Sequence, residues 1–247
     1  MLDGRSLFAS RAAPRIGLAA SSIALFLWLA ACGDSSTDGG GGQGAGGDGA
    51  GGEGGSEPEP VETVLHPDQP PLPGETECVV TIWDHLPFEG QTHVGVCTDV
   101  AYQTNPPSSG NHWPIWAQFR TYDAPVPRPM LVHDLEHGAV IMSHRCDPAC
   151  PDVVAAFQQA AAAFGIDELC VNTSAGAVSQ RIIITPDPLL DEPIALSAWR
   201  STYTATCIDP PSLLDFIEQH YAQGPENLCA LGKDPADPET GVPGCEL

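Results

Sequence analysis

The sequence predicts one α+β domain, in which two or three helices pack on a small mixed sheet that begins with an N-terminal hairpin. From residue 139 onward, short apolar runs with strand character alternate with segments of helical period. About 170 residues follow the last stretch of biased composition, which is enough for one hydrophobic core. Eight cysteines beyond residue 32 indicate that disulfides staple the domain. A thioredoxin-like fold is the alternative.

Residues 1–31 have the composition of an export signal that ends in a lipidation motif. Arg5, Arg11 and Arg15 precede an apolar run that is shorter than the ~20 residues of a membrane span. The run ends in Leu-Ala-Ala-Cys, which resembles the bacterial lipobox, so we expect Cys32 to be acylated. The lipoprotein would then be exported and anchored through its lipid to the outer face of a bacterial membrane. A plain secretory signal is the alternative.

Residues 32–60 are predicted to be a flexible tether, because they hold 13 of the 26 glycines and almost no large apolar side chain. Residues 61–74 are rich in proline and are expected to form an extended lead-in. The globular domain is then expected to span residues 75–247. The net charge of −23 repels phosphate backbones, so we expect no nucleic-acid partner. The sequence identifies no protein or small-molecule partner.

The cysteine pattern predicts up to four disulfides in an exported chain. We expect local pairs, with Cys78 bonded to Cys97 across the hairpin and Cys229 bonded to Cys245 in the tail. The remaining question is whether the Cys-x-x-x-Cys sequence at residues 146–150 forms a structural disulfide or takes part in thiol chemistry.

The hairpin is expected to join strands at residues 78–83 and 93–97. Pro106 and Pro107 exclude a helix from the next segment, which is predicted to be a rigid loop. A short helix is expected to start at Pro129 and to end at Gly138. The later elements are predicted as strands at 139–144, 181–185, 194–199 and 203–208, with one helix that ends at Gly165 and another that starts at Ser212.

The rigid loop carries polar residues next to two tryptophans. Asn105, Trp113 and Trp116 are therefore expected to form a pocket wall, beside His112. A structural corner, with the tryptophans as packing residues, is the alternative.

Three histidines are the candidate metal ligands. His133 and His137 are one helical turn apart, so both imidazoles lie on the same face of the predicted helix. With His112 they would make a three-imidazole site, which suits zinc or copper. Glu136 would orient a ligand or act as an acid–base group. Histidines that only satisfy backbone carbonyls are the alternative, and His93 is expected to be an exposed polar residue.

Four sequence blocks together resemble the domain of unknown function 3105 family of bacteria. They are Asn-Pro-Pro-Ser-Ser-Gly-Asn-His-Trp at 105–113, Val-His-Asp-Leu-Glu-His-Gly at 132–138, Ile-Ala-Leu-Ser-Ala-Trp at 194–199 and Gly-Pro-Glu at 224–226. The resemblance covers most of the domain and implies a single exported or membrane-anchored domain with the histidine blocks at its centre. It implies no activity.

A metallohydrolase is a second hypothesis. The order His-x-x-Glu-His at residues 133–137 resembles the zinc motif of inverzincin metalloproteases, in which Glu136 would be the catalytic base. Such an enzyme needs a further acidic ligand downstream and a longer helix than this segment offers.

Two further hypotheses use other residues. A strand followed by Cys146 and Cys150 at the start of a helix resembles the copper-delivery proteins of cytochrome oxidase assembly, which predicts copper or thiol redox chemistry. A non-catalytic envelope module would instead bind a peptide or glycan on the wall of Trp113 and Trp116. The sequence does not decide whether the domain is an enzyme.

Overall fold

The computed structural model describes residues 57–146, 150–173, 178–242 and 244–245. The predicted export signal, the lipidation site Cys32 and most of the tether lie outside the described residues. The description below therefore concerns the folded part of the chain.

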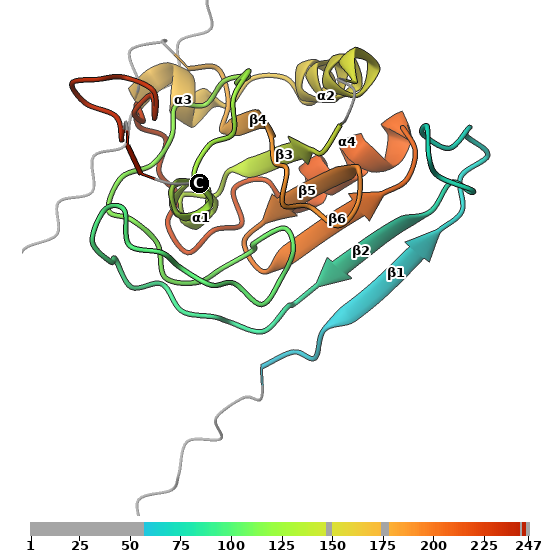
Figure 1. Cartoon of the computed structure of the whole chain (residues 1–247), viewed down its shortest axis with the longest axis horizontal. Helices are drawn as coiled ribbons and strands as arrows, with labels where there is room; N and C mark the ends of the chain where they lie inside the picture. The colour runs from blue at the N-terminus through green and yellow to red at the C-terminus, as the bar shows by residue number, and fades with distance from the viewer. Residues whose placement is uncertain (1–56, 147–149, 174–177, 243, 246–247) are drawn as a thin grey trace, which may run out of the picture. The chain divides into compact units, whose positions relative to one another are not determined.

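Six strands form one mixed sheet in the order β1–β2–β6–β5–β3–β4 (Figure 1). The strands are β1 (Val61–Leu65), β2 (Val80–Asp84), β3 (Val140–His144), β4 (Ile182–Pro186), β5 (Ile194–Ala198) and β6 (Ser201–Ala205). Strands β3 and β4 are parallel, whereas every other neighbouring pair is antiparallel. The predicted α+β class with a small mixed sheet is confirmed.

The described residues hold four helices, α1 (Arg128–Glu136), α2 (Pro151–Phe164), α3 (Glu168–Thr173) and α4 (Pro210–His220). Three of them, α1, α2 and α4, pack on the sheet. Val140 and Met142 of β3 pack with α2 and α4, whereas Ile141 packs with α1. Because side chains alternate along a strand, α1 lies on the face opposite to α2 and α4. The alternation predicted for residues 139–144 is therefore confirmed.

The last four strands have a recognisable connectivity. The chain runs β3–α2–α3–β4, then through the antiparallel pair β5–β6, and ends in α4. The strand order β6–β5–β3–β4, with only β3 and β4 parallel, is that of a thioredoxin-like core. The connectivity thus agrees with the thioredoxin-like alternative. Among the helices of the described residues, none combines the length and apolar character that a membrane crossing needs.

Helix α1 begins and ends where the local sequence indicates. Proline stands in its first turn, where its missing N–H costs no hydrogen bond. Gly138 follows the helix with a φ of 83°, and a Cβ there would come within 2.9 Å of the Ala222 backbone. The start predicted for the last helix is too late, because Asp209 caps α4 by accepting a hydrogen bond from the Ser212 N–H.

The sequence predicts an N-terminal hairpin in which residues 78–83 pair with residues 93–97. This pairing is wrong. Strand β2 pairs with β1 and with β6, so the N-terminal antiparallel pair recruits residues from the predicted lead-in. Residues 93–97 turn instead, because the Thr98 N–H donates to the Gly95 carbonyl and Cys97 has a φ of 64°.

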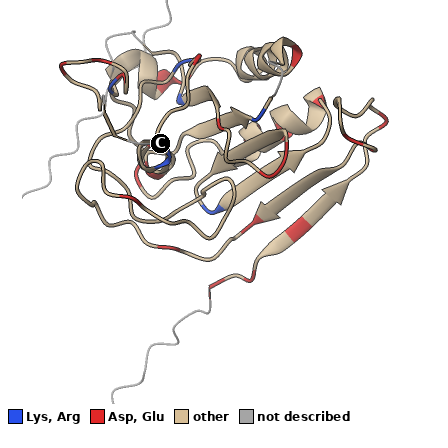
Figure 2. Cartoon of the chain, in the orientation of Figure 1, with Lys and Arg blue, Asp and Glu red and all other residues tan. Residues whose placement is uncertain are grey.

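The predicted local disulfides are also wrong. The four observed pairs are Cys78–Cys207, Cys97–Cys245, Cys146–Cys150 and Cys170–Cys229. Because β2 lies beside β6, the cysteine before β2 meets the cysteine after β6. Figure 2 shows that acidic residues are spread over many loops of the described domain and also occur on β1 and β2.

Candidate metal centre

Four side chains converge between α1 and the irregular segment that precedes it. His93, His112, His133 and Glu136 present ligand atoms that all lie within 4.8 Å of one another. We call these four residues the histidine cluster. Two of the three predicted ligands belong to it, together with Glu136, while His93 takes a place that the sequence did not suggest.

His112 is fully buried and held in one orientation. Its Nδ1 lies 2.9 Å from the Gly110 carbonyl oxygen, so the Nδ1–H donates to that carbonyl. The other ring nitrogen, Nε2, lies 3.0 Å from Glu136 Oε2. The backbone N–H of His112 also donates to the Thr92 carbonyl, which fixes the loop against the neighbouring segment.

His133 is held in the same way from helix α1. Its Nδ1 lies 2.6 Å from the carbonyl oxygen of Trp113, so this nitrogen is the donor. Its Nε2 lies 3.2 Å from His137 Nε2, as two residues one turn apart on a helix allow. Both buried rings therefore direct Nε2, with its lone pair, toward the cluster.

His93 closes the cluster from the solvent side. Its ring stacks on that of His133 with centroids 4.8 Å apart, and its Nε2 lies 3.8 Å from Glu136 Oε2. The side chain is 52 % exposed. The Val94 N–H donates to the His112 carbonyl, which places residue 93 beside the rigid loop. This pairing joins two irregular segments, so no local sequence pattern predicts it.

His137 lies beside the cluster but outside the group of four. It follows the last residue of α1, and its Nε2 lies 3.4 Å from Glu226 Oε2 as well as near His133. Its buried Nδ1 has no hydrogen-bond partner within the described parts of the chain. The Glu226 side chain is 56 % exposed, so His137 has a neighbour that contacts solvent on this side. Sequence patterns predict no role for Glu226 beyond its place in the Gly-Pro-Glu block.

The imidazoles of His133 and His137 are neutral at neutral pH. Burial lowers the pKa of His133 to about 3; the Trp113 carbonyl opposes this shift, and the neighbouring imidazoles add to it. Burial also lowers the pKa of His137 to about 4, although the Glu226 carboxylate opposes the shift. Neutral imidazoles keep the lone pair that a metal ion needs.

Glu136 and His112 present two acceptors to each other. Because the Nδ1–H of His112 is donated to Gly110, its Nε2 carries a lone pair that faces the Glu136 carboxylate at 3.0 Å. Two lone pairs at this distance repel unless a positive charge lies between them. A second proton on His112 or a shared metal cation would meet this need.

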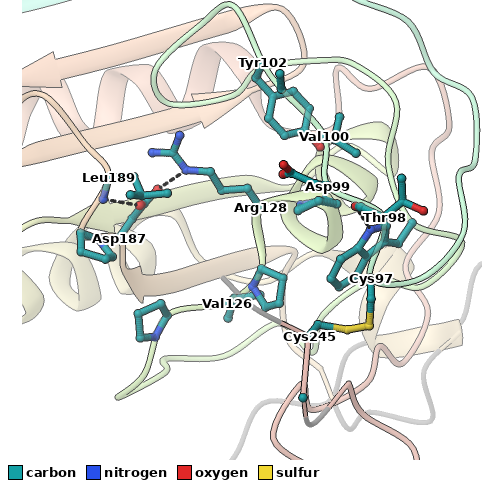
Figure 3. Close-up of a pocket in the computed structure, with 17 residues that line it drawn as sticks. Cys97, Thr98, Asp99, Val100, Tyr102, Val126, Arg128, Asp187, Leu189 and Cys245 are labelled. Atoms are coloured by element: carbon teal, nitrogen blue, oxygen red, sulfur yellow. Dashed lines mark hydrogen bonds and ion pairs between the residues drawn. A yellow bond between two sulfur atoms is a disulfide. The ribbon is translucent and has the colours of Figure 1, made fainter.

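The predicted pocket wall divides between two places. The Trp116 ring packs on His133 and His137, with centroids 5.1 and 4.8 Å away. Trp113 instead lines a cavity of about 750 Å³ whose other residues include Arg128 and Asp187, which form an ion pair (Figure 3). Asn105 is not at the cluster, because its Oδ1 accepts a hydrogen bond from Arg128.

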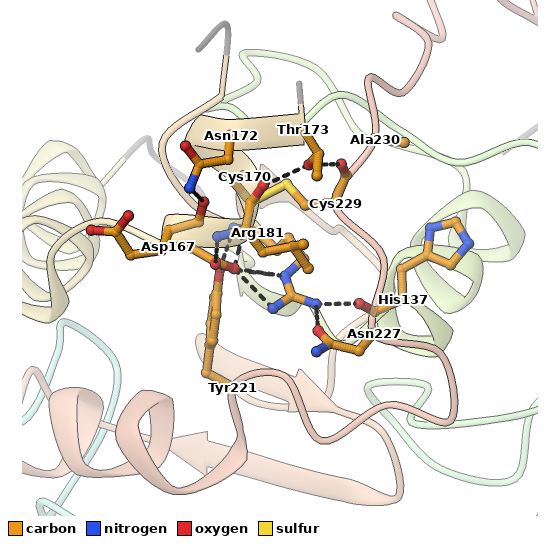
Figure 4. The surroundings of a disulfide bond; sticks show 12 residues. His137, Asp167, Cys170, Asn172, Thr173, Arg181, Tyr221, Asn227, Cys229 and Ala230 are labelled. Carbon is orange, nitrogen blue, oxygen red and sulfur yellow. Dashed lines mark hydrogen bonds and ion pairs between the residues drawn. A yellow bond between two sulfur atoms is a disulfide. The ribbon is translucent and has the colours of Figure 1, made fainter. Parts of the chain in front are cut away.

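Arg181 stabilises the backbone next to the histidine cluster. Its buried guanidinium donates to the His137 carbonyl at 2.8 Å and to Asn227 Oδ1 at 2.7 Å (Figure 4). It also forms an ion pair with Asp167. The same side chain thus ties the end of α1 to the segment that carries Glu226. Sequence analysis missed this role, since Arg181 was assigned only to a core strand.

The Gly-Pro-Glu block lies directly on the end of α1. A Cβ on Gly224 would collide with the carbonyl oxygen of Glu136 and with the backbone nitrogen of Gly138. The Glu226 N–H donates to the Glu136 carbonyl at 2.9 Å. The block therefore needs glycine for close approach.

The other predicted pair lies elsewhere. Cys146 and Cys150 form a disulfide that follows the last residue of β3, whereas α1 and the histidine cluster precede its first residue. The length of a central strand therefore separates the two places.

Comparisons with known proteins identify the family of this chain and no other property. No curated protein and no solved structure matches the chain. The model of a family described as protein of unknown function (DUF3105) matches residues 93–230, a span that is more than half of the chain and holds the whole histidine cluster, His137 and Glu226. The chain therefore belongs to the DUF3105 family of proteins of unknown function.

Proposed function

We propose that this domain binds a divalent transition-metal ion through His93, His112, His133 and Glu136. The convergence of their four ligand atoms within 4.8 Å of one another carries the proposal. Three imidazoles and one carboxylate suit zinc, with copper(II) as the next choice.

The hydrogen bonds around the cluster support this proposal. Metal-binding histidines usually donate their second ring N–H to a carbonyl or carboxylate, which fixes the ring and its tautomer. His112 and His133 each donate Nδ1–H to a backbone carbonyl. Their Nε2 atoms are thus aimed before a metal arrives.

The spacing is also suitable. Zinc–nitrogen bonds of about 2.0 Å in a tetrahedral site separate the ligand atoms by about 3.3 Å. The separations from Glu136 Oε2 are 3.0 Å to His112 Nε2 and 3.8 Å to His93 Nε2. Small side-chain rotations would bring these atoms to metal-bonding positions. The exposed ring of His93 leaves an approach for the ion.

The metallohydrolase hypothesis is less well supported by the same geometry. In the His-x-x-Glu-His motif the glutamate must stay free to activate water. Here Glu136 Oε2 lies within the ligand group, and α1 ends at this residue after nine positions. We therefore assign Glu136 as a metal ligand and assign no catalytic step.

The compartment proposed from the leader is consistent with the described domain. Four disulfides favour an oxidising environment, as expected for an exported and lipid-anchored chain. The domain would then meet its metal outside the cytoplasm.

Metal content decides the proposal. The full chain, without a polyhistidine tag, is stripped with chelator, loaded with zinc, desalted and measured by elemental analysis. We expect about one zinc per chain, and His112→Ala and His133→Ala should each abolish most of it. The matched control is His66→Ala, which removes an exposed histidine outside the cluster.

Two results would count against the proposal. Wild-type protein that keeps less than a tenth of an equivalent would leave a plain His112–Glu136 ion pair as the explanation. Equal zinc content in His112→Ala and His66→Ala would place the metal elsewhere.

A further inference from the structure

A second group of ligand atoms lies at the far end of β3. His144 Nδ1, Cys146 Sγ and Cys150 Sγ all lie within 4.8 Å of one another, and the proposed metal centre uses none of them. The two sulfurs are joined as a disulfide, and His144 Nδ1 lies 3.8 Å from Cys150 Sγ. All three residues are half-buried, so small reagents can reach them.

This disulfide contributes least to holding the fold together. Its cysteines are 4 residues apart, whereas the other three bridges span 59, 129 and 148 residues. A cross-link restricts the unfolded chain less as its loop shortens. In addition, β3 and α2 are already joined by the hydrophobic core, which contains Met142 of β3 and Phe157 of α2. A structural role alone therefore explains this bridge poorly.

The position of Cys150 favours thiol chemistry. Cys150 is the N-cap residue of α2, a helix of 14 residues, and its carbonyl accepts from the Val153 and Val154 N–H groups. The positive end of the helix dipole stabilises a thiolate at this position.

A low-pKa sulfur is the better leaving group in thiol–disulfide exchange. A thiolate that attacks Cys146 Sγ would therefore release Cys150 as the stabilised thiolate. Once the bridge is open, two sulfurs and one imidazole nitrogen face a common point. Thiolate and imidazole ligands suit copper(I) and zinc but not magnesium, and a set of three ligands satisfies copper(I), whereas zinc needs a fourth.

We propose that Cys146 and Cys150 form a reducible pair that, when reduced, binds copper(I) together with His144. The reductant is a dithiol. Its first thiolate attacks Cys146 Sγ, the Cys146–Cys150 bond breaks, and its second thiol releases Cys146 and leaves the reductant as a disulfide. Two electrons and two protons pass to the pair. Copper(I) then replaces the two thiol protons without changing its oxidation state.

Thiol mapping of the full chain tests the reducible pair. The folded protein is treated with increasing concentrations of a dithiol, labelled with a thiol-alkylating reagent and digested for mass spectrometry. We expect label on Cys146 and Cys150 at a dithiol concentration at least tenfold below the one that labels Cys78, Cys170 or Cys229. Labelling of all pairs at one concentration, or of another pair first, would overturn the proposal.

Copper(I) titration against a coloured chelator tests the ligand set. Reduced protein should bind one equivalent more than oxidised protein. The double variant Cys146→Ser/Cys150→Ser should lose this equivalent, and His144→Ala should weaken its binding at least tenfold. His112→Ala should keep it, which separates this site from the metal centre. If the double variant does not fold, the comparison of oxidised with reduced wild type decides alone: equal copper uptake overturns the proposal.

Discussion

Acid should destabilise the metal-free domain through its buried histidines. His133 and His137 are 4 % and 2 % exposed, and burial lowers their pKa values to about 3 and about 4. In the unfolded chain both would titrate near 6.5. Between these limits the unfolded state binds more protons than the folded state, so lowering the pH favours unfolding.

The size of the effect follows from the proton count. Each histidine that is protonated only in the unfolded state changes the unfolding free energy by about 1.4 kcal/mol per pH unit. His133 and His137 together should therefore cost up to about 2.7 kcal/mol per pH unit between pH 6 and pH 4. Above about pH 8 neither ring is protonated in either state, so their contribution is constant. Burial also lowers the pKa values of His144 and His220, which adds to the slope in the same direction.

A single substitution isolates one proton. His137→Phe keeps a ring at this position and removes its titration. Urea denaturation of metal-free protein at half-unit steps from pH 8 to pH 4.5 gives the unfolding free energy of each form. The slope of the variant should be smaller than that of the wild type by about 1.4 kcal/mol per pH unit below pH 6. Parallel curves for the two proteins would refute the reasoning, because they would mean that His137 titrates alike in both states.

Three other predictions test separate contacts. Gly224→Ala should lower the unfolding free energy by roughly 2 kcal/mol or more in urea denaturation, because its Cβ would collide with the end of α1; a loss below about 0.5 kcal/mol would contradict this. Cys78→Ala/Cys207→Ala should lower the free energy of unfolding by about 5 kcal/mol, and Cys146→Ala/Cys150→Ala should lower it by about 2 kcal/mol. The melting temperatures of the two variants should therefore differ by roughly 6–12 °C. Equal melting temperatures would contradict the loop-length argument. Copper(II) should quench Trp116 fluorescence and saturate near one equivalent, because this ring packs on His133 and His137; the same quenching in Trp116→Phe would place the ion elsewhere.

Local elements of the site could be predicted from the sequence because their causes are local. Pro129 and Gly138 mark the ends of one short helix, and helical spacing puts His133 and His137 on one face. The alternation of β3 likewise follows from its own residues. His112 could also be predicted as a site residue, because the prolines that precede it stiffen its loop.

The remaining parts depend on contacts between distant segments. His93 joins the cluster only because residues 92–94 run beside His112, whereas the sequence predicts residues 93–97 as a strand of a hairpin. Cys78 meets Cys207 because β2 lies next to β6, which is a property of the whole sheet. Glu226 reaches His137 because Gly224 allows close packing on α1. None of these neighbours is encoded by spacing along the chain.

The unfavourable features of the histidine cluster indicate that it serves a function and does not only stabilise the fold. Burial opposes the protonation of His133 and His137, and His137 Nδ1 is buried without a hydrogen-bond partner among the described residues. The Nε2 lone pair of His112 also faces the carboxylate of Glu136 unless a proton or a cation lies between them. Apolar side chains of similar volume would fill the same space without these penalties. Proteins keep several unfavourable local features in one place chiefly where a ligand or reaction offsets them. A cation that accepts the lone pairs of His112 and His133 and neutralises Glu136 would remove two of these penalties at once. For this reason, zinc should raise the melting temperature of the wild type and leave that of His112→Ala unchanged.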